Sequence, residues 1–293
     1  MATECKKYAL ITGCTPGGIG HFLAIEFASK GFHVLATVRD PTKYTTPSEN
    51  ITYVPLELTS TDSIKALRAT VSQITGGKLD ILYNNAGRNY TVAALDIKDH
   101  EVRQVFETNV FAVMKMCRTF VPLLIETKGT IVQTGSLAGL MPYVFGSGYN
   151  ASKAALHAYS DTLRVELAPL GVRVLNIVTG GVKSNLARVE RKLPEDSYYQ
   201  PLKADYERRL KHAQTLGMDT HTYAKDCVAE VLGREGWFVK KRWAWEGRKS
   251  WVMWFMWNLF PRLGLGPGLD WYFSRLFCLE KLKGTVGPDK KRV

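Results

Sequence analysis

The stretch ITGCTPGGIG, from Ile11 to Gly20, decides the fold of this chain. It follows an apolar run, precedes a helical pattern and contains closely spaced glycines. Glycines let a backbone approach a pyrophosphate, and the helix that follows offers unpaired N–H groups to its charge. An ordinary tight strand–helix connection has a similar sequence, so the surrounding residues must distinguish the two interpretations.

Around this turn, the first 180 residues alternate apolar β-branched runs with longer helical patterns, which is typical of a parallel sheet covered on both faces. The predicted strands are Tyr8–Ile11, His33–Thr37, Thr52–Leu56, Ile81–Tyr83, Thr130–Gln133 and Arg173–Ile177. The predicted helices are His21–Ser29, Thr61–Gln73, Asp99–Phe120 and Tyr149–Leu167. We therefore predict an α/β, doubly wound parallel sheet (Rossmann fold) that binds its ligand beyond the carboxyl ends of the strands.

The composition is that of a folded globular protein, with 45% hydrophobic and 23% charged residues in 293. The five cysteines are scattered without a C-x-x-C pair, and the six histidines lack metal-ligand spacing. We therefore expect neither a disulfide framework nor a metal site. We also expect the protein to lie in a reducing compartment. The N-terminal MATECKKYAL has no apolar core, so we expect no secretory signal.

The composition changes near residue 236. The net charge of the chain is +12, and +8 of it comes from Gly233 onward, where there are 13 Lys/Arg and 5 Asp/Glu. All seven tryptophans also lie there, between Trp237 and Trp271. We predict a sheet domain at 1–236 and a C-terminal aromatic-rich helical appendage at 237–293.

The end of the second predicted strand indicates which dinucleotide is bound. A carboxylate there would bind the ribose diol of NAD, whereas HVLATVRD offers Arg39. Arginine pairs well with a 2′-phosphate, so the sequence favours NADPH. Asp40 follows directly and weakens this argument, and a surface arginine without a ligand is the alternative.

Four residues carry the chemistry: Asn109, Ser136, Tyr149 and Lys153. Tyr149 and Lys153 in YNASK are four apart, so they share one face of a helix. The ammonium and a positive nicotinamide ring should lower the pKa of the phenol, making it a suitable acid for an alkoxide. Ser136 can hydrogen-bond the substrate carbonyl.

With NNAG at 84–87, TNV around Asn109 and YxxxK, residues 6–235 resemble the short-chain dehydrogenase/reductase family. By this resemblance Asn109 holds a water in the proton relay, and Lys153 also binds the nicotinamide ribose. The resemblance further implies cofactor contacts at Gly13, Thr15, Gly18, Ile19, Gly20, Glu57, Asn85, Ala86, Gly87, Gly180, Val182 and Ser184.

Three departures from the family pattern affect the cofactor side only. The glycine loop is one residue longer than usual, with Pro16-Gly17-Gly18, so the phosphate contacts of Thr15 are not fixed by the motif. Thr179 replaces a common proline, and Glu57 stands where an aspartate is usual.

Within the family, TGC and ATVRDP resemble the 17β-hydroxysteroid dehydrogenases and the fungal NADPH-dependent 1-acyldihydroxyacetone-phosphate reductases, and TPGGIG favours the latter. This resemblance implies reduction of a lipid ketone to lysophosphatidate at the cytosolic face of the endoplasmic reticulum or a lipid droplet. Reduction of a steroid or polyketide ketone is the alternative, and a non-catalytic lipid-binding scaffold is the third.

The residues around the expected substrate site are mixed in character. A substrate lid is expected at about 185–225. In one interpretation its cations Arg188, Arg191, Lys192 and Lys203 meet a substrate phosphate, and in the other they belong to an ordinary solvated helix face. An apolar pocket is expected beside Tyr149, from Leu137, Leu140, Met141, Pro142 and Phe145.

The segment WVMWFMWNLF, 251–260, is too short to span a bilayer as a helix. With its basic flanks it predicts a monotopic membrane-binding region at 237–283. A subunit interface or a hydrophobic lid on the pocket is the alternative, whereas nucleic acid is not expected. The family resemblance also implies a homodimer, paired through the helices that contain Asn109 and Tyr149.

Overall fold

The computed structural model describes residues 6–184, 191–233, 242–259 and 265–282. Seven parallel strands form one sheet in the order β3-β2-β1-β4-β5-β6-β7. The strands are β1 (Lys7–Ile11), β2 (Phe32–Val38), β3 (Ile51–Pro55), β4 (Ile81–Asn84), β5 (Thr130–Thr134), β6 (Arg173–Thr179) and β7 (Trp243–Glu246). The chain order reverses between β1 and β4, so the doubly wound fold is confirmed and its ligand site is expected there.

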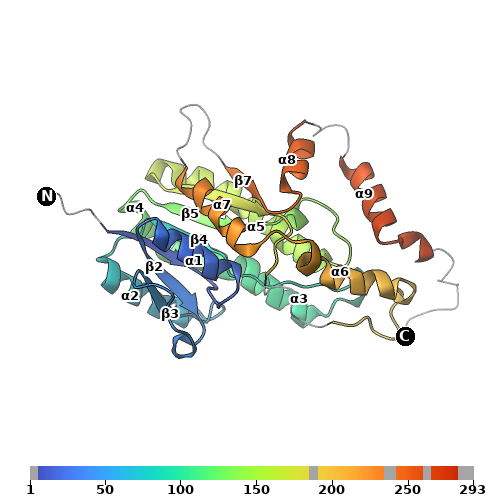
Figure 1. Cartoon of the computed structure of the whole chain (residues 1–293), viewed down its shortest axis with the longest axis horizontal. Helices are drawn as coiled ribbons and strands as arrows, with labels where there is room; N and C mark the ends of the chain where they lie inside the picture. Colours follow the sequence, from blue (N-terminus) through green and yellow to red (C-terminus); the bar gives the residue numbers. More distant parts are fainter. Residues whose placement is uncertain (1–5, 185–190, 234–241, 260–264, 283–293) are drawn as a thin grey trace.

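Helices cover both faces of this sheet, as Figure 1 shows. On one face, α1 (Ile19–Ser29) and α7 (Thr220–Leu232) pack through Leu23, Phe27 and Val228. On the other, α2 (Thr61–Thr75), α4 (Ala112–Ile125) and α5 (Ser147–Leu167) share an apolar core. Strands buried on both faces explain why their sequences are continuous apolar runs.

One long helical stretch contains a π-helical segment between two α-helical parts. It begins as α3 (Asp99–Phe106), continues through the π-helical η3 (Glu107–Phe111) and ends as α4. By length and hydropathy, Asp99–Ile125 is the one helix in the described residues that could cross a membrane. However, half of its most apolar part is buried inside the protein. Because Met116, Phe120 and Leu124 lie in the core beneath the sheet, it is a core helix.

The strand β7 corrects the predicted boundary near residue 236. It pairs with β6 over four residues, from Asn176 opposite Trp243 to Thr179 opposite Glu246. Its Trp243 indole donates to Oδ1 of Asp161 at 3.1 Å and packs against His157. The sheet therefore extends to residue 246, and two of the tryptophans assigned to the appendage belong to it.

Beyond β7, the aromatic-rich helices α8 (Ser250–Leu259) and α9 (Leu265–Leu276) lie at the end of the molecule opposite α2 and β3 (Figure 1). They build a third apolar cluster, in which Met253, Phe273 and Phe277 join Phe145 and Tyr206. Tyr206 comes from α6 (Lys203–Leu216). The short helical turns are η1 (Pro41–Lys43), η2 (Ala94–Asp96), η4 (Leu137–Gly139), η5 (Ala168–Leu170), η7 (Gln200–Leu202) and η8 (Leu279–Leu282).

Candidate active site

A cavity of about 1550 Å³ opens at the carboxyl ends of the strands. It runs from the glycine-rich turn, across the ends of β4 and β5, to α8 and α9. Of the predicted site residues, those that line it are Gly13, Thr15, Gly18, Ile19, Arg39, Glu57, Asn85, Ala86, Gly87, Ser136, Tyr149, Lys153, Gly180, Val182 and Ser184. Gly20 and Asn109 are not in the lining, and both act from behind it.

The glycine-rich turn is shaped by close backbone contacts. Gly13 has φ +74°, and a Cβ there would lie 3.0 Å from Ala86. A Cβ on Gly20 would lie 2.5 Å from the Gly13 carbonyl oxygen and 2.6 Å from Nδ2 of Asn85. Gly20 therefore lets α1 begin against the turn, which aims its free N–H groups at the cavity. The turn fits a dinucleotide pyrophosphate.

The two charged residues after β2 point to different partners. Arg39 is exposed and lines the cavity. The Asp40 carboxylate accepts hydrogen bonds from the backbone and hydroxyl of Thr42 and pairs with Lys43 at 3.3 Å. These bonds lower the pKa of Asp40 and cap the η1 turn. The carboxylate that weakened the NADPH prediction is thus engaged locally, and Arg39 remains for the 2′-phosphate.

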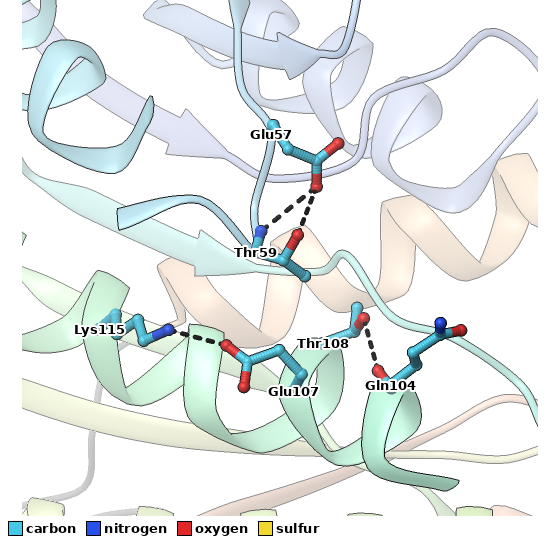
Figure 2. Close-up of polar contacts among 6 residues, drawn as sticks. All are labelled: Glu57, Thr59, Gln104, Glu107, Thr108 and Lys115. Carbon is cyan, nitrogen blue, oxygen red and sulfur yellow. Dashed lines mark hydrogen bonds and ion pairs between the residues drawn. The ribbon is translucent and has the colours of Figure 1, made fainter. Parts of the chain in front are cut away.

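One end of the cavity, where we expect the adenosine of the cofactor, lies between the loop after β3 and the long helix of α3 and η3. Figure 2 shows Glu57 accepting from the backbone and hydroxyl of Thr59, across from Gln104, Glu107 and Thr108. Glu107 is paired with Lys115 at 2.7 Å. Gln104 and Glu107 carry no motif, and Thr108 was noted only as part of TNV, so the sequence did not predict these three as lining residues.

The reactive groups meet at the end of β5. Lys153 and Tyr149 are one turn apart on α5, with the Lys153 Nζ 5.8 Å from the phenol ring centroid. Nζ donates to the Thr134 carbonyl oxygen at 2.7 Å. The Tyr149 hydroxyl is hydrogen-bonded to Ser136, whose Oγ also accepts from the Ala138 N–H. The predicted Ser136–Tyr149–Lys153 set is therefore assembled in one place.

Burial dominates the electrostatics of this set. It raises the pKa of Tyr149, which the Ser136 hydrogen bond and Arg209 lower to a smaller extent. Burial also lowers the pKa of Lys153 to about 8. The sequence predicted a lowered pKa for the Tyr149 phenol. In the protein without cofactor this pKa is raised instead, because the effect of burial exceeds that of the neighbouring hydrogen bond and charge. The phenol is protonated at neutral pH and is ready to act as an acid.

Asn109 supports the site from the π-helical segment. Its Oδ1 accepts from the Arg88 N–H at 2.8 Å, and its Nδ2 donates to the Arg88 carbonyl and to Oγ of Ser152, both at 3.0 Å. The side chain thus fastens the loop after β4 to α5 and uses both Nδ2 hydrogens, while Oδ1 keeps one further lone pair. Its part in a proton relay stays a prediction, and the π-helical segment can also leave backbone groups available for such a role.

The three predicted lid cations that the structure describes, Arg191, Lys192 and Lys203, do not line the cavity. Arg191 pairs with Glu101 at 3.0 Å and stacks on Tyr90. Lys192 and Lys203 are exposed, and Arg188 lies outside the described residues. Instead Arg209, which no motif marks, lines the substrate end beside Leu137, Met141 and Tyr143. Pro142 is exposed, and Leu140 and Phe145 pack behind the lining.

The C-terminal helices form the far wall of the same cavity. Val252 and Met253 of α8 and Tyr272, Phe273 and Leu276 of α9 line it. The hydrophobic-lid alternative is therefore correct for the inner sides of both helices. The sequence did not separate the two sides of these helices, because lining and exposed positions are both apolar or aromatic.

A half-buried phenol beside an ammonium, in a groove that continues to a pyrophosphate turn, is suited to hydride exchange between a nicotinamide and a carbonyl. This defines the class: the protein is an NADP-dependent oxidoreductase. A family model described as short chain dehydrogenase matches residues 7–194. The chain belongs to the short-chain dehydrogenase family.

Individual relatives are similar over most of the chain. Short-chain dehydrogenase srdE of Neurospora crassa is 41% identical over 286 residues, 97% of this chain and 96% of its own. An NADPH-dependent 1-acyldihydroxyacetone phosphate reductase of Schizosaccharomyces pombe is 38% identical over 243 residues, 80% of this chain and 81% of its own. A short chain dehydrogenase from Burkholderia cenocepacia, solved with NADP, shares the fold with a TM-score of 0.70, at 20% identity over 92% of this chain and 97% of its own.

Proposed function

We propose that this protein uses NADPH to reduce a ketone on a hydrophobic substrate, with 1-acyldihydroxyacetone phosphate as the leading candidate and lysophosphatidate as its product. The observation that carries the proposal is that Ser136, Tyr149 and Lys153 share one cavity with an apolar wall of α8 and α9. The cofactor end of the same cavity has the glycine turn and Arg39. The relative from S. pombe supports the choice of substrate.

The chemistry follows from the arrangement of the side chains. NADPH, held by the glycine turn and Arg39, would supply a hydride to the carbonyl carbon. Ser136 Oγ and the Tyr149 hydroxyl hold the carbonyl oxygen, and Tyr149 gives its proton to the alkoxide as charge develops there. Lys153 stabilises the resulting phenolate and orients the nicotinamide ribose. The proton on Tyr149 is then restored from solvent through the site supported by Asn109.

A second candidate rests on the extent of similarity. The N. crassa relative aligns over 97% of this chain, against 80% for the acyldihydroxyacetone phosphate reductase. The N. crassa relative thus shares nearly the whole chain, including almost all of the C-terminal region that forms the apolar wall. We therefore keep reduction of another hydrophobic ketone, of steroid or polyketide type, as the alternative. The two candidates differ in whether the substrate carries a phosphate.

We also propose that the C-terminal helices bind a membrane surface, at the cytosolic face of the endoplasmic reticulum or a lipid droplet. Trp251 and Trp271 are 71% and 63% exposed, on helices whose Met253 and Phe273 line the cavity. Tryptophan favours the level of lipid headgroups, and Lys249 and Arg275 are next to these aromatic residues. A lipid substrate would then enter between the two helices.

We further propose a homodimer through α4 and α5. Phe111, at the start of this region, and Val165 on α5 are exposed apolar side chains. Val165 shares the outer side of α5 with the exposed residues Ala154 and Ala158, whereas Phe111 belongs to η3. Sedimentation equilibrium of the full chain tests the pairing.

The substrate is tested by NADPH consumption with long-chain 1-acyldihydroxyacetone phosphate in liposomes, beside steroid and polyketide ketones. We expect turnover with the acyl phosphate that is lost in Tyr149→Phe. Turnover confined to the neutral ketones would contradict the leading candidate and support the second. Absence of turnover with every ketone, while NADPH still binds, would support the non-catalytic scaffold.

A further inference from the structure

Arg209 on α6 has an unusual place for a charged residue. It is only 7% exposed and lines the substrate end of the cavity. Its guanidinium carbon lies 3.6 Å from the ring centroid of Tyr143, so the planar group is stacked on the ring. A Cβ on Gly146 would lie 3.7 Å from its Nη2, which places the guanidinium near the start of the catalytic helix α5.

No residue in the described parts of the chain pairs with this charge. The nearest carboxylate on the same helix, Asp205, pairs instead with Arg208 at 2.9 Å and with Lys281 at 3.2 Å. The Nε of Arg209 is buried without a hydrogen-bond acceptor. The polar groups that act on the guanidinium are the phenols of Tyr143, Tyr149 and Tyr206, and burial lowers the pKa of Arg209.

A guanidinium remains protonated even when buried, so the unpaired cation costs folding free energy. Such a cost is offset when a ligand supplies the missing anion. Stacking on Tyr143 fixes the plane of the fork, which matches the two oxygens of a carboxylate or phosphate. The carbonyl oxygen is already held by Ser136 and Tyr149, so Arg209 is available for a second group of the substrate.

We propose that Arg209 is the specificity-determining residue of this site, binding an acidic oxygen, of a phosphate or a carboxylate, on the hydrophobic ketone. The apolar body of that ketone lies against Met253, Phe273 and Leu276. The inference rests on the proposed function in taking this end of the cavity as the substrate site. It replaces the lid cations Arg191, Lys192 and Lys203 as the group that recognises an anion.

The test is binding rather than turnover, so it does not depend on which ketone is reduced. The NADP⁺ complex of the full chain is titrated calorimetrically with decyl phosphate and decanoate, each below its micelle concentration, and with decanol below its solubility limit. We expect an acidic probe to bind more tightly than decanol, and the tighter of the two acids identifies the anion. Arg209→Gln should weaken that acid about tenfold or more, without weakening decanol.

Three controls accompany this variant. Lys211→Gln removes a charge from the exposed side of the same helix and should behave as the unaltered protein. Arg209→Lys keeps the charge without the planar fork and should fall between Arg209→Gln and the unaltered protein. Tyr149→Phe should bind the acidic probe normally, which separates anion binding from catalysis.

Several outcomes would overturn the proposal. One is equal affinity of the unaltered complex for the acids and decanol, or no binding of either acid. Another is equal weakening of all three probes by Arg209→Gln, which would indicate a structural role for the residue. Weakened NADPH binding as the sole effect would assign Arg209 to the cofactor. Failure of every ketone to react would contradict the proposed function and leave the anion site standing.

Discussion

At the scale of single residues, the position of Ser136 depends on a histidine that no motif marks. The Ser136 N–H donates to Nε2 of His157 at 3.1 Å, from two turns beyond Tyr149 on α5. Burial, and then the charge of Lys153, lower the pKa of His157 to about 3. The ring therefore stays neutral and keeps Nε2 as an acceptor. Local sequence does not reveal this role, because the contact joins residues 21 apart.

This histidine predicts how stability depends on pH. Its folded pKa lies below its ordinary value of 6.5, so the unfolded chain binds the extra proton first as pH falls. As the pH falls from 6.5 to about 3, this residue should therefore lower the free energy of unfolding by about 1.4 kcal/mol for each pH unit. His157→Gln keeps an acceptor but removes the titration. Urea unfolding at neutral and mildly acidic pH should show a shallower loss in the variant, and an equal loss in both proteins would contradict this account.

Arg39 predicts the choice of cofactor. Arg39→Ala should raise KM for NADPH about 10-fold to 100-fold, the value of a charge-assisted hydrogen bond, and leave KM for NADH unchanged. Lys43→Ala is the matched control, since Lys43 is exposed and pairs with Asp40. Steady-state kinetics with the two cofactors measures both values. A parallel change for NADPH and NADH would show that Arg39 does not read the 2′-phosphate.

At the scale of elements, the turn before α1 tolerates no side chain at Gly20. Gly20→Ala should drive the new methyl into the Gly13 carbonyl and Asn85, and push the helix away from β1. We expect a loss of about 1–3 kcal/mol of unfolding free energy together with weakened NADPH binding. Urea unfolding and fluorescence titration with NADPH measure the two effects. Normal affinity and stability would mean that the helix start is not held as closely as described.

The elements also show how far sequence could predict this molecule. The six predicted strands match the structure within two residues, because their sequences are short, mostly apolar and rich in β-branched residues, and the inner strands are largely buried. The strand β7 escaped prediction, since four residues containing two tryptophans resemble the aromatic segment that follows. Ser136, Tyr149 and Lys153 carry motifs and were predicted, whereas Arg209 depends on the fold of α6 over the cavity. Its position follows from tertiary packing, which single-sequence patterns do not encode.

At the scale of the whole molecule, α8 and α9 line the cavity with one side and expose aromatic residues on the other. Trp251→Ser with Trp271→Ser should reduce co-flotation with anionic vesicles, because both indoles are exposed. Leu170→Ser, which removes an exposed apolar side chain from η5, is the matched control. Turnover of a water-soluble ketone should be unchanged in both proteins. Undiminished flotation of the double variant would contradict membrane binding through α8 and α9.

The most direct test of the whole account compares the unaltered protein with Tyr149→Phe in NADPH consumption, using ketones from the acyl phosphate, steroid and polyketide classes. We predict that the unaltered protein turns over at least one of them. Tyr149→Phe should bind NADPH with the same affinity and lose about 100-fold or more of that turnover. Equal turnover in the two proteins would show that the Tyr149 phenol is not the proton donor and would contradict the account.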